Sequence, residues 1–255
     1  MMKGAEPIFI NNHGDVGILM LHGFTSTPDE FRELSVYLSE QGFNLYAPLI
    51  AGHGTSPEDL MKTRPEDWML SAKQAYVRIK ATSQKVFIIG NSFGSNLGFW
   101  LIKEFKNEPA GIITLDAPII LRNHFFAILR LYTYGLFKKY YVKSKKVYET
   151  DYIDGADDIT YRLIPLKSLR EFLKFIKYES IPHLSEVKIP ILIAHSKDDP
   201  IIHPKSAPYI HSHIGSSSKK IYWVESRYHG FTIEGRRKEV FHMISKFIQE
   251  ILSYE

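Results

Sequence analysis

Six short apolar segments recur along the chain and alternate with segments whose apolar residues have a helical spacing. The six lie at residues 16–24, 43–50, 85–92, 111–118, 189–196 and 219–226. They are mostly apolar and rich in β-branched or aromatic residues, which is typical of strands buried on both faces of a sheet. Strands that alternate with helices form βαβ units. The pattern therefore predicts an α/β fold with a mostly parallel central sheet flanked by helices.

The composition narrows the classes of function. Of the 255 residues, 44% are hydrophobic and 24% are charged, so the chain can bury a large core. A formal charge of +4 is small for this length and argues against a nucleic-acid binder. Cysteine is absent, which excludes disulfides, thiolate metal sites and a cysteine nucleophile. No apolar run reaches the length of a signal-peptide core or a membrane span, so we expect a soluble, cytoplasmic protein.

Two of the predicted helices have clear sequence signals. Thr27 and Glu30 form a predicted capping box around Pro28, and Gly42 stands where that helix is expected to end. In the last helix, apolar residues recur at i, i+3 and i+4 between residues 240 and 252. This stripe predicts a helix that packs on the sheet.

Residues 121–188 interrupt the alternation, because they contain helical spacing but no convincing buried strand. The helical spacing is found at residues 123–142 and 168–180. We therefore expect a core of residues 1–120 and 189–255 that carries a helical cap, or lid, of residues 121–188. The cap mixes aromatic residues with lysines, which we interpret as a solvated cationic face, with weak contact to a membrane surface as the alternative. These lysines are Lys138, Lys139, Lys143, Lys145 and Lys146.

A serine stands at the end of one predicted strand, in the sequence "GNSFG" at residues 90–94. An abrupt turn from strand to helix crowds the residues two positions to either side of its corner. Gly90 and Gly94 occupy these positions around Ser92, with a predicted strand before them and a predicted helix beginning near Phe93. The helix N-terminus offers an amide and a partial positive charge to an oxyanion. The pattern therefore predicts that Ser92 is a nucleophile.

A serine hydroxyl is activated by a base, and a carboxylate fixes the orientation of that base. His229 follows the predicted strand at 219–226, and Asp198 and Asp199 follow the one at 189–196. Catalytic groups of open parallel sheets gather at such strand ends. The chain order Ser92, Asp199, His229 is the order typical of α/β-hydrolases.

Other histidines are less suited to the role of base. His22 precedes the serine in the chain, which is the wrong order, and we interpret it as a residue that orients its own loop. His211 and His213 lie two positions apart in a predicted helix. They point to different faces, which argues against a zinc site.

These motifs resemble the α/β-hydrolase superfamily, and within it the bacterial carboxylesterase and monoacylglycerol lipase group. The resemblance covers nearly the whole chain and is carried by "LMLHGFTSTPDEF", "AGHGTSPEDL", "GNSFG", "YRLIPLKSLREFLKFIK", "SKDDPII" and "YHG". It implies an α/β-hydrolase fold with a helical lid. It also implies Ser92 as nucleophile, His229 as base and Asp199 as the acid. The backbone N–H groups of Phe24 and Phe93 are the implied oxyanion hole.

Two other aspartates compete with Asp199 for the role of acid. Neighbouring side chains in an extended segment point in opposite directions, so at most one of Asp198 and Asp199 can face His229. The register of the resembled group favours Asp199. Asp116 also ends a predicted strand, and we interpret it instead as a carboxylate that binds loop amides.

The resemblance implies a serine hydrolase that cleaves short- to medium-chain acyl esters through an acyl-enzyme, without a cofactor or a metal ion. The expected partner is a small-molecule acyl ester and not a nucleic acid. The alternatives are a feruloyl- or cinnamoyl-type esterase, a thioesterase or an amidase with the same triad, and a non-catalytic binding protein of the same fold. The predicted turn around Ser92 is bulkier than is usual for the group, because Phe93 stands in place of Leu or Met and Ser95 in place of glycine.

Overall fold

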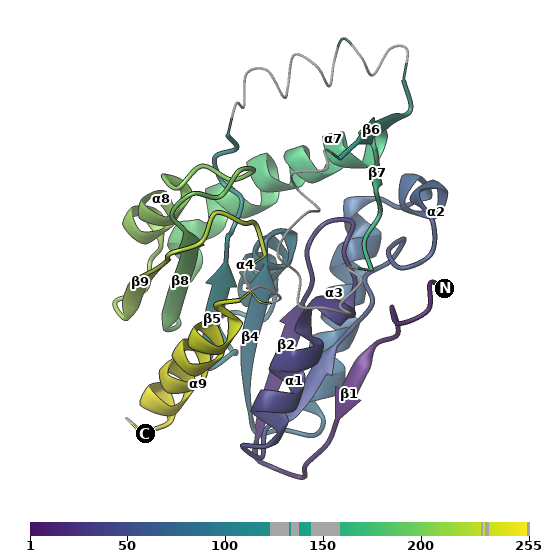
Figure 1. The fold of residues 1–255 in the computed structure, drawn as a ribbon. Helices are drawn as coiled ribbons and strands as arrows, with labels where there is room; N and C mark the ends of the chain where they lie inside the picture. Colours follow the sequence, from purple (N-terminus) through teal and green to yellow (C-terminus); the bar gives the residue numbers. More distant parts are fainter. Residues whose placement is uncertain (123–132, 134–137, 144–158, 231, 233–234, 254–255) are drawn as a thin grey trace.

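The centre of the molecule is a seven-stranded sheet with the strand order β1-β3-β2-β4-β5-β8-β9 (Figure 1). The computed structural model describes residues 1–122, 133, 138–143, 159–230, 232 and 235–253. β1 pairs antiparallel with β3, and every other neighbouring pair is parallel. All six predicted strands are present, so the predicted α/β sheet is confirmed. The strands are β1 (Ile8–Ile10), β2 (Val16–Leu21), β3 (Asn44–Ala47), β4 (Lys85–Asn91), β5 (Gly111–Leu115), β8 (Ile191–Ser196) and β9 (Lys219–Val224).

β1 is not among the predicted strands. It is only three residues long, and a strand this short is stabilised by its pairing and not by a pattern of its own. The Phe9 ring meets the Tyr46 ring of β3 edge to face, with 5.7 Å between their centroids. The guanidinium of Arg78 lies over both rings, 4.6 and 4.9 Å from their centroids. Contacts from distant parts of the chain therefore hold this edge of the sheet.

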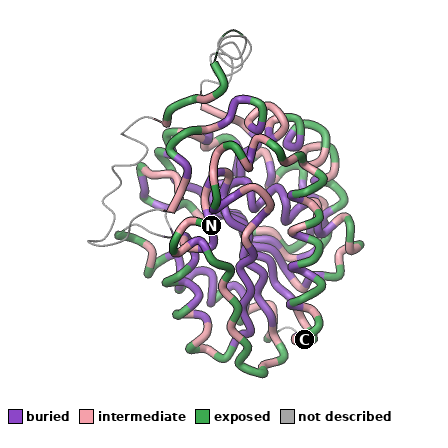
Figure 2. The backbone as a smooth tube through the Cα atoms, turned by 90° about the vertical axis from the view of Figure 1, so that its right-hand side faces the viewer, coloured by how far each residue is buried: buried purple, intermediate pink, exposed green. Residues whose placement is uncertain are grey.

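Helices cover both faces of the sheet. Side chains of β2 alternate between the two layers: Ile18 and Met20 face one, and Leu19 and Leu21 face the other. The strands consequently form the buried centre in Figure 2. No helix in the described ranges combines the length and apolar character needed to span a bilayer. One layer contains α1 (Arg32–Ser39) and α9 (Arg237–Ser253), and the other α3 (Pro65–Lys80), α4 (Phe93–Glu104) and α8 (Ser206–His213).

The first helix begins differently from the prediction. A 3-10 turn at Pro28–Phe31 precedes α1, and the Thr27 side chain makes no capping hydrogen bond. Glu30 Oε1 accepts a hydrogen bond from the Gly23 backbone N–H at 3.0 Å. The predicted capping box is therefore wrong, because its carboxylate binds the loop after β2 instead. α1 ends at Ser39, three residues before the predicted stop, and Gly42 takes a φ of +85° in the turn that follows.

The predicted cap is described at residues 121–122, 133, 138–143 and 159–188. Two short strands, β6 (Tyr140–Val142) and β7 (Leu163–Pro165), pair antiparallel there, so the helical interpretation of residues 123–142 is wrong at β6. The helix α7 (Leu166–Phe175) agrees with the helical spacing at 168–180 and lies at the top of Figure 1. Lys145, Lys146 and most of residues 123–158 lie outside the described residues. The division into core and cap stays a prediction.

The stripe on α9 gives a direct test of the core. Ile244 is fully buried in the layer shared with α1, whereas His242 on the same helix is exposed. Ile244→Ala leaves a cavity, and we expect the free energy of unfolding to fall by about 2–4 kcal/mol. His242→Ala should change it by less than about 0.5 kcal/mol. Urea unfolding followed by circular dichroism measures both, and equal losses would contradict this placement of the helix.

Candidate active site

Ser92 stands in the turn between β4 and α4, and close packing imposes its backbone conformation. Its φ and ψ are 49° and −117°, a strained combination that costs about 1–3 kcal/mol. A Cβ on Gly94 would lie 1.8 Å from Leu21 O, and one on Gly90 would lie 2.4 Å from the Ser95 backbone nitrogen. Only glycine fits at either position. The spacing of the two glycines around the serine therefore has a steric cause.

The structure brings the three predicted triad residues into one chain of contacts. His229 Nε2 lies 2.9 Å from Ser92 Oγ, and His229 Nδ1 lies 2.7 Å from Asp199 Oδ2. Because ionised Asp199 can only accept, the imidazole carries its proton on Nδ1 and presents the lone pair of Nε2 to the hydroxyl. The His229 side chain is 17% exposed, whereas Asp199 is fully buried. A proton can therefore pass from Ser92 Oγ to His229 Nε2 while the other ring nitrogen stays bound to buried Asp199.

Asp199 is held as a carboxylate by several donors. Its Oδ1 accepts hydrogen bonds from the backbone N–H groups of Ile201 at 2.7 Å and Ile202 at 2.9 Å. Burial acts to raise the pKa of Asp199, but the charge of His229 and these hydrogen bonds outweigh burial and hold the pKa below its ordinary value. Arg122 Nε also donates to the Asp199 backbone carbonyl. Asp199 is thus ionised and fixed in place.

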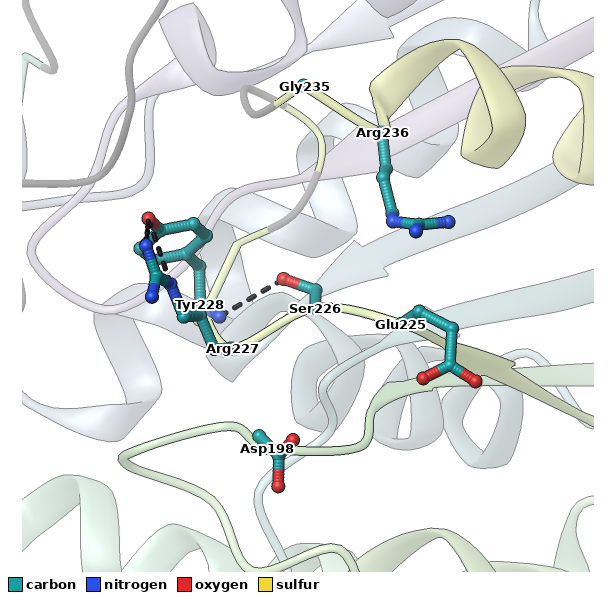
Figure 3. Close-up of a pocket in the computed structure, with 7 residues that line it drawn as sticks. All are labelled: Asp198, Glu225, Ser226, Arg227, Tyr228, Gly235 and Arg236. Carbon is teal, nitrogen blue, oxygen red and sulfur yellow. Dashed lines mark hydrogen bonds between the residues drawn. The ribbon is translucent and has the colours of Figure 1, made fainter.

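Asp198 points elsewhere. It is exposed and lines an open pocket of about 370 Å³ (Figure 3). Ser92, Asp199 and His229 are not part of that lining. Of the two adjacent aspartates, only Asp199 contacts the imidazole. The other residues that line the pocket are Glu225, Ser226, Arg227, Tyr228, Gly235 and Arg236.

The pairing with Asp199 changes the basicity of His229. Burial acts to lower the pKa of His229, but the charge of Asp199 and its hydrogen bond outweigh burial and raise the pKa above its ordinary value. The imidazolium that forms when Ser92 gives up its proton is therefore stabilised. This is the electrostatic contribution expected of a buried carboxylate beside a general base.

Asp116, the third candidate acid, lies behind the imidazole. Its Oδ2 is 3.9 Å from His229 Nδ1, too far for a hydrogen bond, whereas Asp199 is at 2.7 Å. Oxygen and nitrogen atoms of Asp116, Asp199 and His229 all lie within 4.8 Å of one another, a donor set of the kind that holds divalent cations. A cation on His229 Nδ1 would displace the proton donated to Asp199. The observed contacts therefore fit a hydrogen-bonded triad better than a metal site.

The loop after β2 runs beside the serine. A Cβ built on Gly23 would lie 3.6 Å from the Cβ of Ser92, which places this part of the loop close to the nucleophile. Phe93 is the first residue of α4, so its N–H has no acceptor within the helix. The oxyanion hole predicted at these two amides stays a prediction, which the place of this loop and the start of α4 beside Ser92 support.

His22 has the orienting contacts that the sequence predicted for it. Its Nε2 accepts a hydrogen bond from the Ile50 backbone N–H at 3.0 Å, so the proton of the neutral ring is on Nδ1. Nδ1 then donates to Gly23 O at 3.0 Å. Burial lowers the pKa of His22 to about 4, so the ring stays neutral. His22 thus ties the loop after β2 to the loop after β3.

Sequence reasoning missed two further residues that hold this loop. Glu30 binds the Gly23 amide, as described above. The Tyr161 backbone N–H donates to Thr25 O at 2.9 Å, and the Tyr161 hydroxyl donates to Gly52 O at 2.9 Å. Tyr161 lies more than a hundred residues from these partners along the chain, so no local signal in the sequence could reveal the contact.

An aromatic cluster includes the side chains of the two residues whose amides are the predicted oxyanion donors. It consists of Phe24, Trp68, Phe93, Phe172 and Phe175. The rings of Phe24 and Phe172 stack with centroids 4.9 Å apart, and Phe93 meets Phe172 edge to face at 5.1 Å. Trp68 comes from α3, and Phe172 and Phe175 come from α7. The side chains beside the amides therefore form an apolar wall.

Comparison with known proteins identifies the class and then the family. The fold and the serine–histidine–aspartate contacts define an α/β-type serine hydrolase. A family model described as serine aminopeptidase, S33, matches residues 14–236, and the chain belongs to this family. The resemblance to α/β-hydrolases that the sequence motifs indicated is confirmed.

Individual relatives support the same group. A thermostable monoacylglycerol lipase of Bacillus sp. (strain H-257) is 29% identical over 241 residues, which cover 92% of this chain and 90% of the relative. A carboxylesterase of Bacillus subtilis (strain 168) is 26% identical over 254 residues, covering 98% and 99%. A solved structure from work on two metagenome-derived lipolytic enzymes, LipS and LipT, superposes with a TM-score of 0.88 at 24% identity. It covers 98% of this chain and 99% of that chain, and shows the shared fold.

The close packing at the turn around Ser92 predicts that one added methyl group strongly lowers the free energy of unfolding. Gly94→Ala would place a Cβ 1.8 Å from Leu21 O, and we expect a loss of at least about 3 kcal/mol in the free energy of unfolding. Gly235→Ala is the control, because a Cβ on Gly235 would meet no atom of the described residues within 4 Å, and its expected change is below about 1 kcal/mol. Urea denaturation measures both. Similar stabilities of the two variants would contradict the close approach of α4 to β2.

Proposed function

We propose that the protein hydrolyses carboxylic esters of the monoacylglycerol type, with short to medium acyl chains, through an acyl-enzyme on Ser92. The observation that carries the proposal is the chain of contacts from Ser92 Oγ through His229 to Asp199, at 2.9 and 2.7 Å. The names of the two Bacillus relatives support an ester as the substrate.

The proposed reaction has two halves. Ser92 Oγ attacks the ester carbonyl carbon while its proton passes to His229 Nε2, and the Phe24 and Phe93 amides stabilise the oxyanion. His229 then gives this proton to the leaving alcohol oxygen as the ester C–O bond breaks. In the second half, water attacks the acyl-enzyme, His229 takes the water proton, and the acid leaves as Ser92 regains its hydrogen. Asp199 stays ionised throughout and stabilises the imidazolium.

The aromatic cluster supports the choice of acyl group. Phe24 is only partly buried, and its ring contacts that of Phe93, the other residue whose amide is a proposed oxyanion donor. An acyl chain bound beside these rings would bury apolar surface, which contributes about 0.8 kcal/mol per methylene. In this proposal, α7 and the rest of residues 121–188 act as the cap over the acyl chain of the substrate.

Removal of the nucleophile tests the assignment of Ser92. Ser92→Ala should lower kcat on p-nitrophenyl butyrate by at least about a thousandfold, because the attacking oxygen is gone. Circular dichroism should show an intact fold. A fluorophosphonate probe should label the parent protein and not the variant. Turnover within about tenfold of the parent would contradict the assignment.

A substrate panel tests the ester class. We expect the highest kcat/KM on butyryl and octanoyl esters and on monooctanoylglycerol. Ethyl ferulate, an acyl thioester and an amino-acid anilide should be slower by at least about tenfold, because their polar groups would lie against the apolar side chains of the aromatic cluster. A preference for any of these three would replace the proposed substrate with that class.

The two adjacent aspartates give a matched pair for the acid. Asp199→Asn should lower kcat by at least about a hundredfold, whereas Asp198→Asn, at an exposed site, should stay within about threefold. In the parent protein, kcat/KM should fall as the pH drops and His229 becomes protonated. Because the Asp199 charge raises the pKa of His229, Asp199→Asn should move this acid limb to lower pH. The opposite ranking of the two variants, or a profile that is flat between about pH 5 and pH 9, would contradict the triad.

A further inference from the structure

Asp116 is a buried carboxyl group beside the triad that the proposed reaction does not use. It follows β5, is fully buried, and has a φ of 46°, which is uncommon for a residue with a side chain. Its Oδ1 accepts a hydrogen bond from the Ser196 backbone N–H at 2.7 Å. Its Oδ2 lies 3.2 Å from Ser196 Oγ and 3.5 Å from the Gly230 backbone nitrogen. The group therefore bridges the end of β8 and the loop that carries His229.

Two buried carboxyl groups this close oppose each other's ionisation. Asp116 and Asp199 are fully buried, and atoms of both lie within 4.8 Å of each other. Two like charges in such a site repel, so one group takes a proton. Asp199 keeps its charge because Ile201, Ile202 and His229 all donate to it. Burial, reinforced by the charge of Asp199, raises the pKa of Asp116 well above its ordinary value.

The hydrogen-bond partners also offer a position for the proton on Asp116. Ser196 Oγ has a single hydrogen and lies 2.8 Å from Tyr228 O and 3.2 Å from Asp116 Oδ2. Tyr228 O is a carbonyl oxygen that can only accept, so it takes the Ser196 hydrogen. With its hydrogen on Tyr228 O, Ser196 Oγ can accept one from a protonated Asp116 Oδ2 across the 3.2 Å contact. This gives a directed chain from Asp116 through Ser196 to Tyr228.

The remaining neighbour of Asp116 carries no charge. His195 Nδ1 lies 3.3 Å from Asp116 Oδ1, on β8. Burial lowers the pKa of His195 to about 4, so its ring is neutral near neutral pH. The titratable groups that face Asp116 are therefore neutral His195, ionised Asp199 and His229.

The hydrogen bonds around Asp116 reach the two residues that flank His229 in the sequence. Tyr228 O and Gly230 N flank His229 in sequence, and both are held by the network around Asp116. We propose that Asp116 is a positioning residue: as an uncharged carboxylic acid it fixes residues 228–230 and so orients His229 toward Ser92. It takes no part in the proton transfer. A second negative charge 3.9 Å from His229 Nδ1 would favour the imidazolium and hinder the base, which the uncharged acid avoids.

Two substitutions separate this role from that of a second charged acid. The proposal rests on the proposed esterase function, and both variants are assayed on p-nitrophenyl butyrate across pH. Asp116→Asn is uncharged, can donate to Ser196 Oγ and should keep kcat within about threefold, with the midpoint of the acid limb moved by less than about 0.3 pH units. Asp116→Ala loses the network and should lower kcat by at least about tenfold, with KM changed by less than about twofold.

Other outcomes of these assays overturn the proposal. If Asp116→Asn loses activity as Asp199→Asn does and its acid limb moves to lower pH, Asp116 is ionised and acts by its charge. If Asp116→Ala keeps kcat within about twofold, Asp116 does not position His229. If Asp116→Ala does not fold, Ser196→Ala replaces it, because it cuts the link from Asp116 to Tyr228. That variant should lower kcat by about three- to tenfold at an unchanged KM, and an unchanged kcat overturns the proposal.

Infrared spectroscopy can detect the proton on the Asp116 carboxyl group without any substrate. The difference spectrum between the parent protein and Asp116→Asn at neutral pH should contain the carbonyl stretching band of a protonated carboxyl group. Asp198→Asn, which alters an exposed carboxylate, is the control and should show only carboxylate bands. Absence of the protonated band for Asp116 overturns the proposal. This measurement stays valid even if the protein hydrolyses no ester, so failure of the proposed function and failure of the Asp116 proposal are distinguishable.

Discussion

Gly94 approaches β2 so closely that a Cβ there would lie 1.8 Å from Leu21 O. This contact places the N-terminus of α4 against the end of β2 and forces the turn at Ser92 into its strained conformation. Phe24 follows β2 within three residues of Leu21, so the same contact brings its loop beside the serine. One steric constraint thus determines the positions of the proposed nucleophile and of both proposed oxyanion donors.

The loops around Ser92 are each held by a buried polar group from another part of the chain. Glu30 binds the Gly23 amide, Tyr161 binds the Thr25 carbonyl, and Asp116 holds the residues beside His229. Leaving any of these buried partners unpaired would cost about 1–3 kcal/mol. The polar contacts therefore fix loops that apolar packing alone would leave free to adopt several conformations.

The sequence predicted those features that have a local pattern. The six apolar strands, the stripe on α9 and the glycines around Ser92 depend on neighbours in the chain, and all are found in the structure. β1, the start of α1 and β6 were not predicted correctly, because long-range contacts decide them. Glu30 shows the reason: its spacing from Thr27 fits a capping box, but the Gly23 amide competes for the same carboxylate.

The candidate site divides in the same way. The strand-end positions of Ser92, Asp199 and His229 predicted that they meet, and the structure shows their contacts, while their catalytic roles stay predictions. Asp116 also follows the end of a strand, as the three triad residues do. Only its distances to Ser196, Gly230 and His229 distinguish it from a second acid.

Phe24 and Phe93 each serve the site in two separable ways, through a backbone amide and through an aromatic ring. Any residue but proline supplies the amide, whereas the ring shapes the apolar wall. Natural drift at these two positions can consequently retune which acyl groups are accepted while the reaction centre is inherited unchanged. The same separation makes them good positions for laboratory evolution of selectivity.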